Sequence, residues 1–268
     1  MNPTLRIGAL ISGGGTNLQA IIDACEIGRI SGKIVFVGSD NPDAFGLGRA
    51  HKHGIPTFVV PYREIIRESR EQRQEWPADF DLEDCLKKQH VLPNDTSPHR
   101  IVQFVVSRVI AEARLLGEMA KYPFDLLVLA GFMRNLTPYF LDRVNTDPQR
   151  PRIMNIHPAL LPAFPGTDGY GDTFRHGCRV GGCTVHFVDY GEDSGPIIGQ
   201  RCFPIQSSDT LEMVKKNGLE QEWILYPECI QAYAEGRLRL ERRAHSLDNG
   251  RIVERTVVVW SSSKEGES

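Results

Sequence analysis

Short apolar runs alternate with amphipathic segments along most of this sequence, and that alternation limits the chain to few folds. The runs, each predicted to be a buried strand, lie at residues 5–12, 33–40, 56–60, 124–131, 151–157, 182–189 and 196–203. Segments with apolar residues at helical spacing lie between them, at residues 16–28, 43–54 and 97–121. Strands that alternate with helices predict an α/β protein with a doubly wound, mostly parallel sheet.

The last third of the chain departs from this alternation. Asp209 and Glu212 have the spacing of a capping box, with Asp209 in place of the usual Ser or Thr, and predict a long helix that ends near Gly236. Beyond it, Asn249-Gly250 between two β-prone runs predicts a short hairpin, and the last eight residues are predicted to be disordered. We therefore expect a main domain over residues 1–240 and a hairpin with a tail over residues 241–268.

Residues 64–95 interrupt the pattern with a charge-rich segment that contains Pro77 and Pro93. The segment looks like an insertion, and a solvated surface helix followed by a loop is the plainest interpretation. A lid or a subunit contact is the alternative. Directly after it, Ser97 is predicted to cap the helix whose first turn contains Pro98.

Composition excludes several classes of protein. The formal net charge of −3 provides no basic field for nucleic acid, and no apolar run approaches the roughly 18 residues that span a membrane. The N-terminus leads directly into a strand without signal-peptide architecture, and six cysteines are scattered without a framework. We expect a cytoplasmic protein with reduced thiols that acts on small molecules, as a monomer or homodimer.

A glycine-rich turn, "SGGGTNLQAII" at residues 12–22, joins the first strand to the first helix. Glycines let backbone N–H groups approach an anion at a helix N-terminus, and Thr16 and Asn17 can add donors. The turn is neither a Walker A loop nor G-x-G-x-x-G, because the glycines are consecutive and Leu18 occupies the third site. Read alone, it favours an anion site no more than a tight turn. Asp40, after the second strand, is a possible ribose ligand or simply part of a turn.

The stretch "IMNIHPALLPAFPG", residues 153–166, places Asn155 and His157 at the end of a predicted strand. Both side chains lie on one face because a strand has period two, and the prolines that follow stiffen the exit. Asp193, before the next predicted strand, can approach His157 to form an acid/base pair. The alternatives are a hydrogen-bonded structural histidine and an ordinary turn residue at 193.

Four stretches together resemble the glycinamide ribonucleotide formyltransferases, a branch of the folate-dependent formyltransferase superfamily. They are "SGGGTNLQAIIDA", "LAGFMRNLTPYF", "IMNIHPALLPAFPG" and "TVHFVDYGEDSGPII", within a similarity that covers most of residues 5–240. The resemblance implies a Rossmann-like fold. It also implies transfer of the formyl group of 10-formyltetrahydrofolate to the amine of glycinamide ribonucleotide, in purine synthesis and without a metal.

The resemblance also implies roles for individual residues. Asn155 and His157 match the residues that stabilise the oxyanion, and Asp193 matches the aspartate that orients the histidine or a water and helps move protons. The acceptor would be held by the phosphate loop and an acidic ribose ligand, namely Gly14, Gly15, Thr16, Asn17 and Glu222. The folate pocket would be formed by Phe132, Met133, Arg134, Asn135, Leu136, His186, Val188, Asp189 and Gly191.

Residues 166–177, "GTDGYGDTFRHG", depart from the family's histidine-containing run. Four glycines predict a mobile loop that is poorly ordered without ligand and closes over the acceptor, with Tyr170 or Asp168 bonding near the amine. A rigid surface turn is the alternative. Nearby His176, Cys178 and Cys183 have no second ligand pair at zinc-like spacing, so we expect no metal.

Other functions share part of this pattern. An amino-sugar nucleotide formyltransferase would need the Asn155, His157 and Asp193 set but not this glycine loop. A methionyl-tRNA formyltransferase or a formyltetrahydrofolate hydrolase usually carries a further domain, for which the chain has little room at either end. A non-enzymatic nucleotide-binding module would explain the glycines but not the set of three polar residues.

Overall fold

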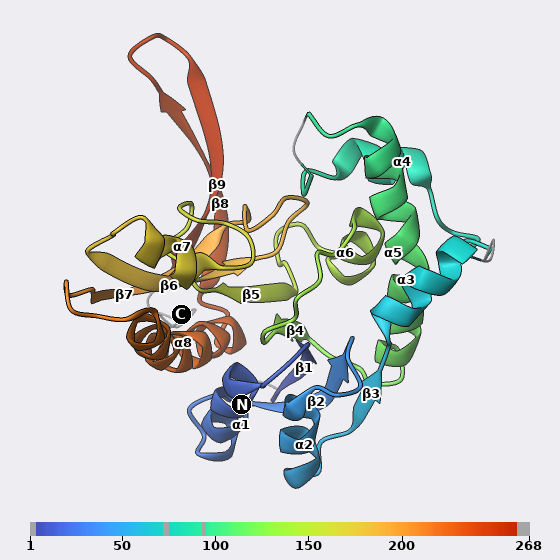
Figure 1. Ribbon diagram of the computed structural model, residues 1–268, viewed down its shortest axis with the longest axis horizontal. Coiled ribbons are helices and arrows are strands. Elements are labelled where there is room, and N and C mark those ends of the chain that lie inside the picture. The colour runs from blue at the N-terminus through green and yellow to red at the C-terminus, as the bar shows by residue number, and fades with distance from the viewer. Residues whose placement is uncertain (1–3, 72–74, 93–94, 262–268) are drawn as a thin grey trace, which may run out of the picture.

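A seven-stranded sheet forms the centre of the protein, which a computed structural model describes over residues 4–71, 75–92 and 95–261. The strand order is β3-β2-β1-β4-β5-β6-β7 (Figure 1). The strands are β1 (Leu5–Ile11), β2 (Gly32–Ser39), β3 (Thr57–Val59), β4 (Leu126–Leu129), β5 (Ile153–His157), β6 (Val180–Phe187) and β7 (Ile197–Pro204). The pairings from β3 to β5 are parallel, whereas β6 is antiparallel to both β5 and β7.

Helices cover both faces of the sheet. One buried core forms between the sheet and the helices α1 (Thr16–Glu26), α2 (Phe45–Lys52) and α8 (Leu211–Ala234). A second core lies on the opposite face, under α3 (Tyr62–Glu71), α4 (Leu82–Lys88), α5 (Pro98–Met119) and α6 (Pro138–Val144). A short helix, α7 (Gly169–Arg175), lies between β5 and β6. In the described ranges no helix is long and apolar enough to cross a membrane.

The predicted fold class is confirmed, including the long C-terminal helix and the hairpin. The alternation of strands and helices fails only at the end of the sheet. There the turn at residues 188–196 joins β6 to β7 directly, and strands joined without a crossover run antiparallel.

The predicted cap of the long helix is wrong by one residue. Thr210 is the N-cap of α8, and its hydroxyl accepts from the Met213 N–H at 3.3 Å. Asp209 instead accepts from the N–H of Gln206 at 2.7 Å in the preceding turn. Ser97 does occupy the N-cap position of α5, but its side chain makes no capping hydrogen bond.

The charge-rich segment at residues 64–95 is packed more closely than predicted. It contains α4 and most of α3, and the side chains of Ile65 and Cys85 are buried in the core under α5. After α4, the N–H of His90 donates to the Tyr190 carbonyl at 2.7 Å, which brings the end of the segment to the loop after β6.

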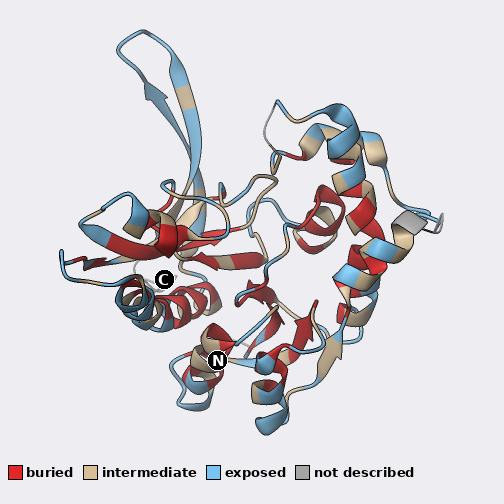
Figure 2. Ribbon diagram, in the orientation of Figure 1, coloured by how far each residue is buried: buried red, intermediate tan, exposed pale blue. Residues whose placement is uncertain are grey.

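The hairpin of β8 (Leu238–Ser246) and β9 (Ile252–Trp260) projects from the body, and most of it is exposed (Figures 1 and 2). Its base is anchored by Trp260, whose indole N–H donates to the Ile198 carbonyl at 2.7 Å. Gly250 adopts φ 78° at the predicted turn. The predicted disordered tail, residues 261–268, lies outside the described ranges except for Ser261. The division near residue 240 stays a prediction.

Candidate active site

The loops that follow β1, β4 and β5 meet at the carboxyl edge of the parallel strands. Ser12, directly after β1, donates its N–H to the Gly131 carbonyl at 3.0 Å and accepts from the Met133 N–H through its hydroxyl at 2.8 Å. These bonds fix the end of β1 against the segment that leaves β4. Open α/β sheets bind ligands at this edge, so the candidate site begins here.

The glycine loop is held tightly against α2. Gly15 has φ 68°, and a Cβ there would lie 2.7 Å from Cα of Gly46. The Gly46 N–H donates to the Gly13 carbonyl at 3.0 Å, and Nε of Arg49 donates to the Gly14 carbonyl at 2.9 Å. With these carbonyls bound to α2, the loop enters α1 at its positive N-terminal end, which suits an anion.

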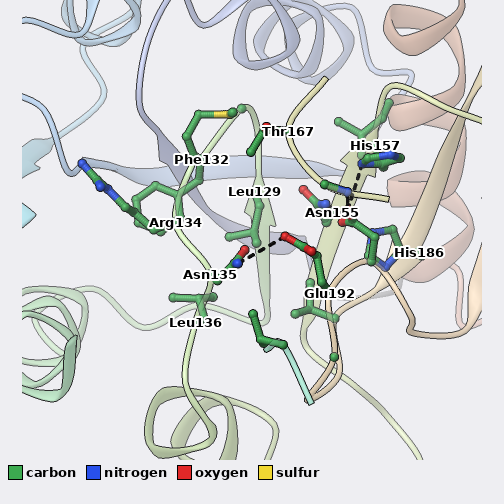
Figure 3. Close-up of a pocket in the computed structure, with 18 of the residues that line it drawn as sticks. Leu129, Phe132, Arg134, Asn135, Leu136, Asn155, His157, Thr167, His186 and Glu192 are labelled. Atoms are coloured by element: carbon green, nitrogen blue, oxygen red, sulfur yellow. Dashed lines mark hydrogen bonds and ion pairs between the residues drawn. The ribbon is translucent and has the colours of Figure 1, made fainter. Parts of the chain in front are cut away.

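A first pocket brings together every residue predicted for catalysis and for folate binding. In Figure 3, Asn155, His157 and His186 lie at one end of this pocket, and Arg134 points away at the opposite end. The predicted residues that line it are Phe132, Met133, Arg134, Asn135, Leu136, Asn155, His157, His186, Val188, Asp189, Gly191 and Asp193. Nδ2 of Asn135 donates to Oε1 of Glu192 at 3.3 Å, which links the two walls.

His157 has oxygen acceptors at both ring nitrogens. Nδ1 lies 3.1 Å from Oδ2 of Asp193, and Nε2 lies 2.8 Å from the carbonyl of Phe164. Only the doubly protonated ring can donate to both at once. The geometry therefore favours an imidazolium, held by a carboxylate on one side and a backbone carbonyl on the other.

Asp193 provides the negative charge of this pair from the turn between β6 and β7. Burial works to raise its pKa, but the hydrogen bond from His186, the charge of His157 and the Gly166 N–H outweigh it, and the pKa is lowered. The Gly166 N–H donates to Oδ2 at 2.8 Å. The carboxylate is therefore ionised across the neutral pH range.

Asn155 lies opposite His186 in the β5–β6 pairing. Nδ1 of His186 lies 2.9 Å from the Phe187 carbonyl, which it can bond only as a donor. Nε2 of the same ring lies 3.2 Å from Nδ2 of Asn155 and 3.6 Å from Oδ1 of Asp193. His186 therefore holds the asparagine amide and the carboxylate next to each other at the edge of the first pocket.

The backbone around the pair adopts an uncommon conformation. Phe164 and Asp193 have φ values of 54° and 49° and are the two non-glycine residues with positive φ in the described ranges. Each presents one of the two acceptors of His157. The left-handed conformation turns the Phe164 carbonyl and the Asp193 side chain toward the same ring.

A second pocket adjoins the first and contains all the residues predicted for the acceptor. The two pockets share a wall formed by Gly131, Met133, Ile156, Pro158 and Thr167. The predicted residues in the second pocket are Gly14, Gly15, Thr16, Asn17, Asp168, Tyr170 and Glu222.

Glu222, on α8, is a buried carboxylate in the wall of this second pocket. Its oxygens accept from Nδ2 of Asn17 and from the hydroxyl of Tyr170, both at 2.6 Å. Burial raises its pKa, and the two hydrogen bonds act in the opposite direction. The carboxylate is thus held in one orientation by α1 and α7.

The segment at residues 166–177 differs from the predicted mobile loop. It contains α7, in which Tyr170 is 6% exposed and directs its hydroxyl to Glu222. Asp168 is the N-cap residue of α7 and pairs with Arg175 at 2.8 Å. Packing of Tyr170 against α8 orders a sequence whose glycines alone indicate mobility.

Asp40, which the sequence offers as a possible ribose ligand, forms an ion pair with an arginine instead. Its side chain is 2% exposed, and Oδ2 lies 2.5 Å from Nε of Arg134, on the wall of the first pocket. The acidic residue after β2 therefore orients a cation in the wall of the first pocket.

Several lining residues were not predicted from the sequence. Thr167 is shared by both pockets, Val91 lines the first, and Lys215 of α8 lines the second. Lys215 could have been found only by its place on α8, seven residues before Glu222 and thus two turns away on the same face. Across residues 4–71, 75–92 and 95–261 there is no group of three or more His, Cys, Asp or Glu able to hold a metal ion.

Comparisons with known proteins agree with this geometry. The family described as "Formyl transferase" matches residues 5–230. The phosphoribosylglycinamide formyltransferase of Escherichia coli (strain K12) is 34% identical over 248 residues, which cover 92% of this chain and 96% of that protein. The enzyme of the same name from Haemophilus influenzae is 35% identical over 91% of this chain and 93% of its own length.

Solved structures show the same relationship. Glycinamide ribonucleotide transformylase 1 from Symbiobacterium toebii superposes with a TM-score of 0.68 at 36% identity, over 97% of this chain and 95% of that chain. The fold is that of a formyl-group transferase, and the chain belongs to the formyl transferase family. Within that family, these three relatives carry the names of glycinamide ribonucleotide enzymes.

Proposed function

We propose that this chain transfers the formyl group of 10-formyltetrahydrofolate to the amine of glycinamide ribonucleotide, a step of purine biosynthesis. One observation carries the proposal: two pockets of different chemistry share a wall next to Asn155, His157 and Asp193. A reaction that joins two small molecules needs such an arrangement. The reaction would take place in the cytoplasm, in a monomer or homodimer.

The chemistry of each pocket suits one of the two substrates. The first pocket has apolar walls from Phe132, Leu136 and Val188, and the backbone of residues 132–136 can hydrogen-bond a flat heterocycle. The second pocket offers the glycine loop at the N-terminus of α1, together with the ammonium group of Lys215, for a phosphate. Glu222 lies in the same pocket, where it can accept from ribose hydroxyls.

Between the pockets, Asn155 and His157 can stabilise negative charge. The acceptor amine forms a C–N bond with the formyl carbon, whose oxygen becomes an oxyanion. The Asn155 amide provides a donor, and the ring of His157, which is 3% exposed, can provide positive charge largely out of water. The oxyanion then collapses, the bond to N10 of the folate breaks, and tetrahydrofolate leaves.

Asp193 balances the protons of this step. The attacking nitrogen must lose a proton, and the N10 leaving group must gain one. An ionised carboxylate beside the pocket can take the proton through a water molecule and return it to N10. The same carboxylate holds the ring of His157 in place through Nδ1.

Incubation with 10-formyltetrahydrofolate and a panel of acceptors tests the proposal. We expect release of tetrahydrofolate that depends on glycinamide ribonucleotide and yields its formyl derivative. An amino-sugar nucleotide and buffer alone are the comparison acceptors. Release that is equally fast in buffer alone, or only with the amino sugar, would contradict the proposal.

A further inference from the structure

We propose that Tyr170 is a positioning residue of the acceptor site, which holds the carboxylate of Glu222 in the orientation that receives the ribose hydroxyls. The inference rests on the proposed function and differs from the expectation that Tyr170 bonds near the reacting amine. The contacts of the carboxylate, the packing of the tyrosine ring and the lone pairs left on the carboxylate support it.

The carboxylate of Glu222 is held at both oxygens. The Tyr170 hydroxyl donates to Oε1 and Nδ2 of Asn17 donates to Oε2, each at 2.6 Å. Glu222 is 4% exposed and Tyr170 is 6% exposed. Because the two donors come from different helices, the carboxylate cannot rotate without losing one of them.

The ring of Tyr170 reaches Glu222 because α8 has no side chain at position 218. A Cβ at Gly218 would overlap Cζ and the hydroxyl of Tyr170. Gly218 precedes Glu222 by about one turn, so both lie on the same face of α8. A glycine inside a helix costs roughly 0.5–1 kcal/mol relative to alanine. The fit of ring to helix accounts for a residue that otherwise weakens α8.

Two acceptor positions remain on Glu222. A carboxylate has about four lone-pair sites, of which Asn17 and Tyr170 use two. The Tyr170 hydroxyl has one proton and donates it to Glu222, so it has none left for the amine or the formyl oxygen. A ribose whose phosphate lies at the glycine loop can therefore donate its neighbouring hydroxyls to the free positions.

Tyr170→Phe tests the proposal, because it removes the hydroxyl and keeps the ring over Gly218. We expect the KM for glycinamide ribonucleotide to rise about tenfold, with kcat and the KM for 10-formyltetrahydrofolate within about twofold of the wild type. The Tyr170 hydroxyl, which this variant lacks, stabilises the ionised form of the Glu222 carboxylate. The weakening of acceptor binding on acidification should therefore begin at a higher pH in the variant, a change that a purely structural role would not produce.

Tyr139→Phe is the matched control. Tyr139 is also buried and donates to a carboxylate, Asp79, at 3.3 Å, but it lies on α6 and lines neither pocket. Its KM values and pH profile should match those of the wild type.

A double-mutant cycle with Glu222→Gln tests the route of the effect. If Tyr170 acts through Glu222, adding Tyr170→Phe to Glu222→Gln changes the KM little further. Independent, multiplicative effects would overturn the proposal. A kcat loss of about tenfold with unchanged KM would also overturn it, since that result places Tyr170 at the amine. Failure of Tyr170→Phe to fold would reduce the tyrosine to a structural role.

Calorimetric titration of the wild type with glycinamide ribonucleotide distinguishes a failure of the proposed function from a failure of the positioning role of Tyr170. A wild type that formylates another amine and does not bind this ribonucleotide overturns the proposed function, and the positioning role with it. A wild type that binds it, together with a Tyr170→Phe variant of unchanged affinity, overturns the positioning role alone.

Discussion

Nδ1 of His157 lies 3.1 Å from Oδ2 of Asp193, although the two residues come from the end of β5 and from the turn after β6. His157 is 3% exposed, so this contact forms largely out of water, where opposite charges attract more strongly. Both residues line the first pocket, and the second pocket adjoins it through Ile156 and Pro158.

His157→Ala and Asp193→Asn should each lower the rate of formyl transfer by about 10²–10⁴, because each removes one charge of the pair. Circular dichroism should show a folded protein in both cases. His245→Ala, in the exposed hairpin, is the matched control and should leave the rate unchanged. Near-normal turnover in either site variant would remove that residue from the mechanism.

The glycine loop allows a comparison between neighbouring positions. A Cβ at Gly14 meets nothing within 4 Å, whereas one at Gly15 meets Gly46 and requires φ 68°. Gly14→Val should therefore weaken binding of glycinamide ribonucleotide without loss of stability, by placing a side chain where the phosphate would lie. Gly15→Val should lower the melting temperature and weaken both substrates. Unchanged affinity in Gly14→Val, measured by calorimetry, would contradict the phosphate assignment.

The link between Asn135 and Glu192 crosses the first pocket at 3.3 Å. Asn135→Ala should raise the KM for 10-formyltetrahydrofolate about two- to tenfold, because a hydrogen bond of this kind contributes about 0.5–1.5 kcal/mol. The KM for the acceptor should not change. Steady-state kinetics with each substrate varied in turn provide the test, and a change confined to the acceptor would reverse the assignment of the pockets.

Glu112 should make stability depend on pH. It is fully buried in α5, accepts from the N–H and hydroxyl of Thr137, and burial raises its pKa from 4.5 to about 7. The folded state therefore binds a proton more tightly than the unfolded state. Protonated Glu112 contributes at most about 3 kcal/mol to the free energy of unfolding. This contribution is fully present below pH 4.5 and is lost as the pH rises to about 7.

Glu112→Gln should flatten that dependence, because an amide resembles the protonated acid and does not ionise. Urea unfolding at several pH values between 4.5 and 8 measures the difference. Glu118→Gln, at a partly exposed position of the same helix, is the control and should retain the wild-type slope. Parallel slopes for wild type and Glu112→Gln would contradict the assignment.

Local patterns in the sequence predict much of this site. Asn155 and His157 can be placed on one face from strand period alone, and the glycine turn from its place after the first strand. The cap of α8 is harder, because Asp209 and Thr210 are both good N-cap residues and only the path of the chain decides between them.

Such local patterns cannot predict contacts between residues that lie far apart in the sequence. The bond from Tyr170 to Glu222 joins residues 52 positions apart and requires a glycine at 218, one turn before Glu222 on α8. Glycines in the sequence around Tyr170 indicate flexibility, whereas packing against α8 provides the order. The antiparallel direction of β6 likewise depends on tertiary pairing.

The left-handed backbone at Phe164 has a consequence for laboratory evolution. A bulky residue at φ 54° costs about 1 kcal/mol or more, and that cost persists only because the carbonyl it turns inward is bonded to His157. A library selected for heat resistance alone should therefore accept Gly or Asn at position 164. Gly and Asn adopt this conformation at lower cost and present the same backbone carbonyl to His157, so such variants should resist heat better without slower formyl transfer.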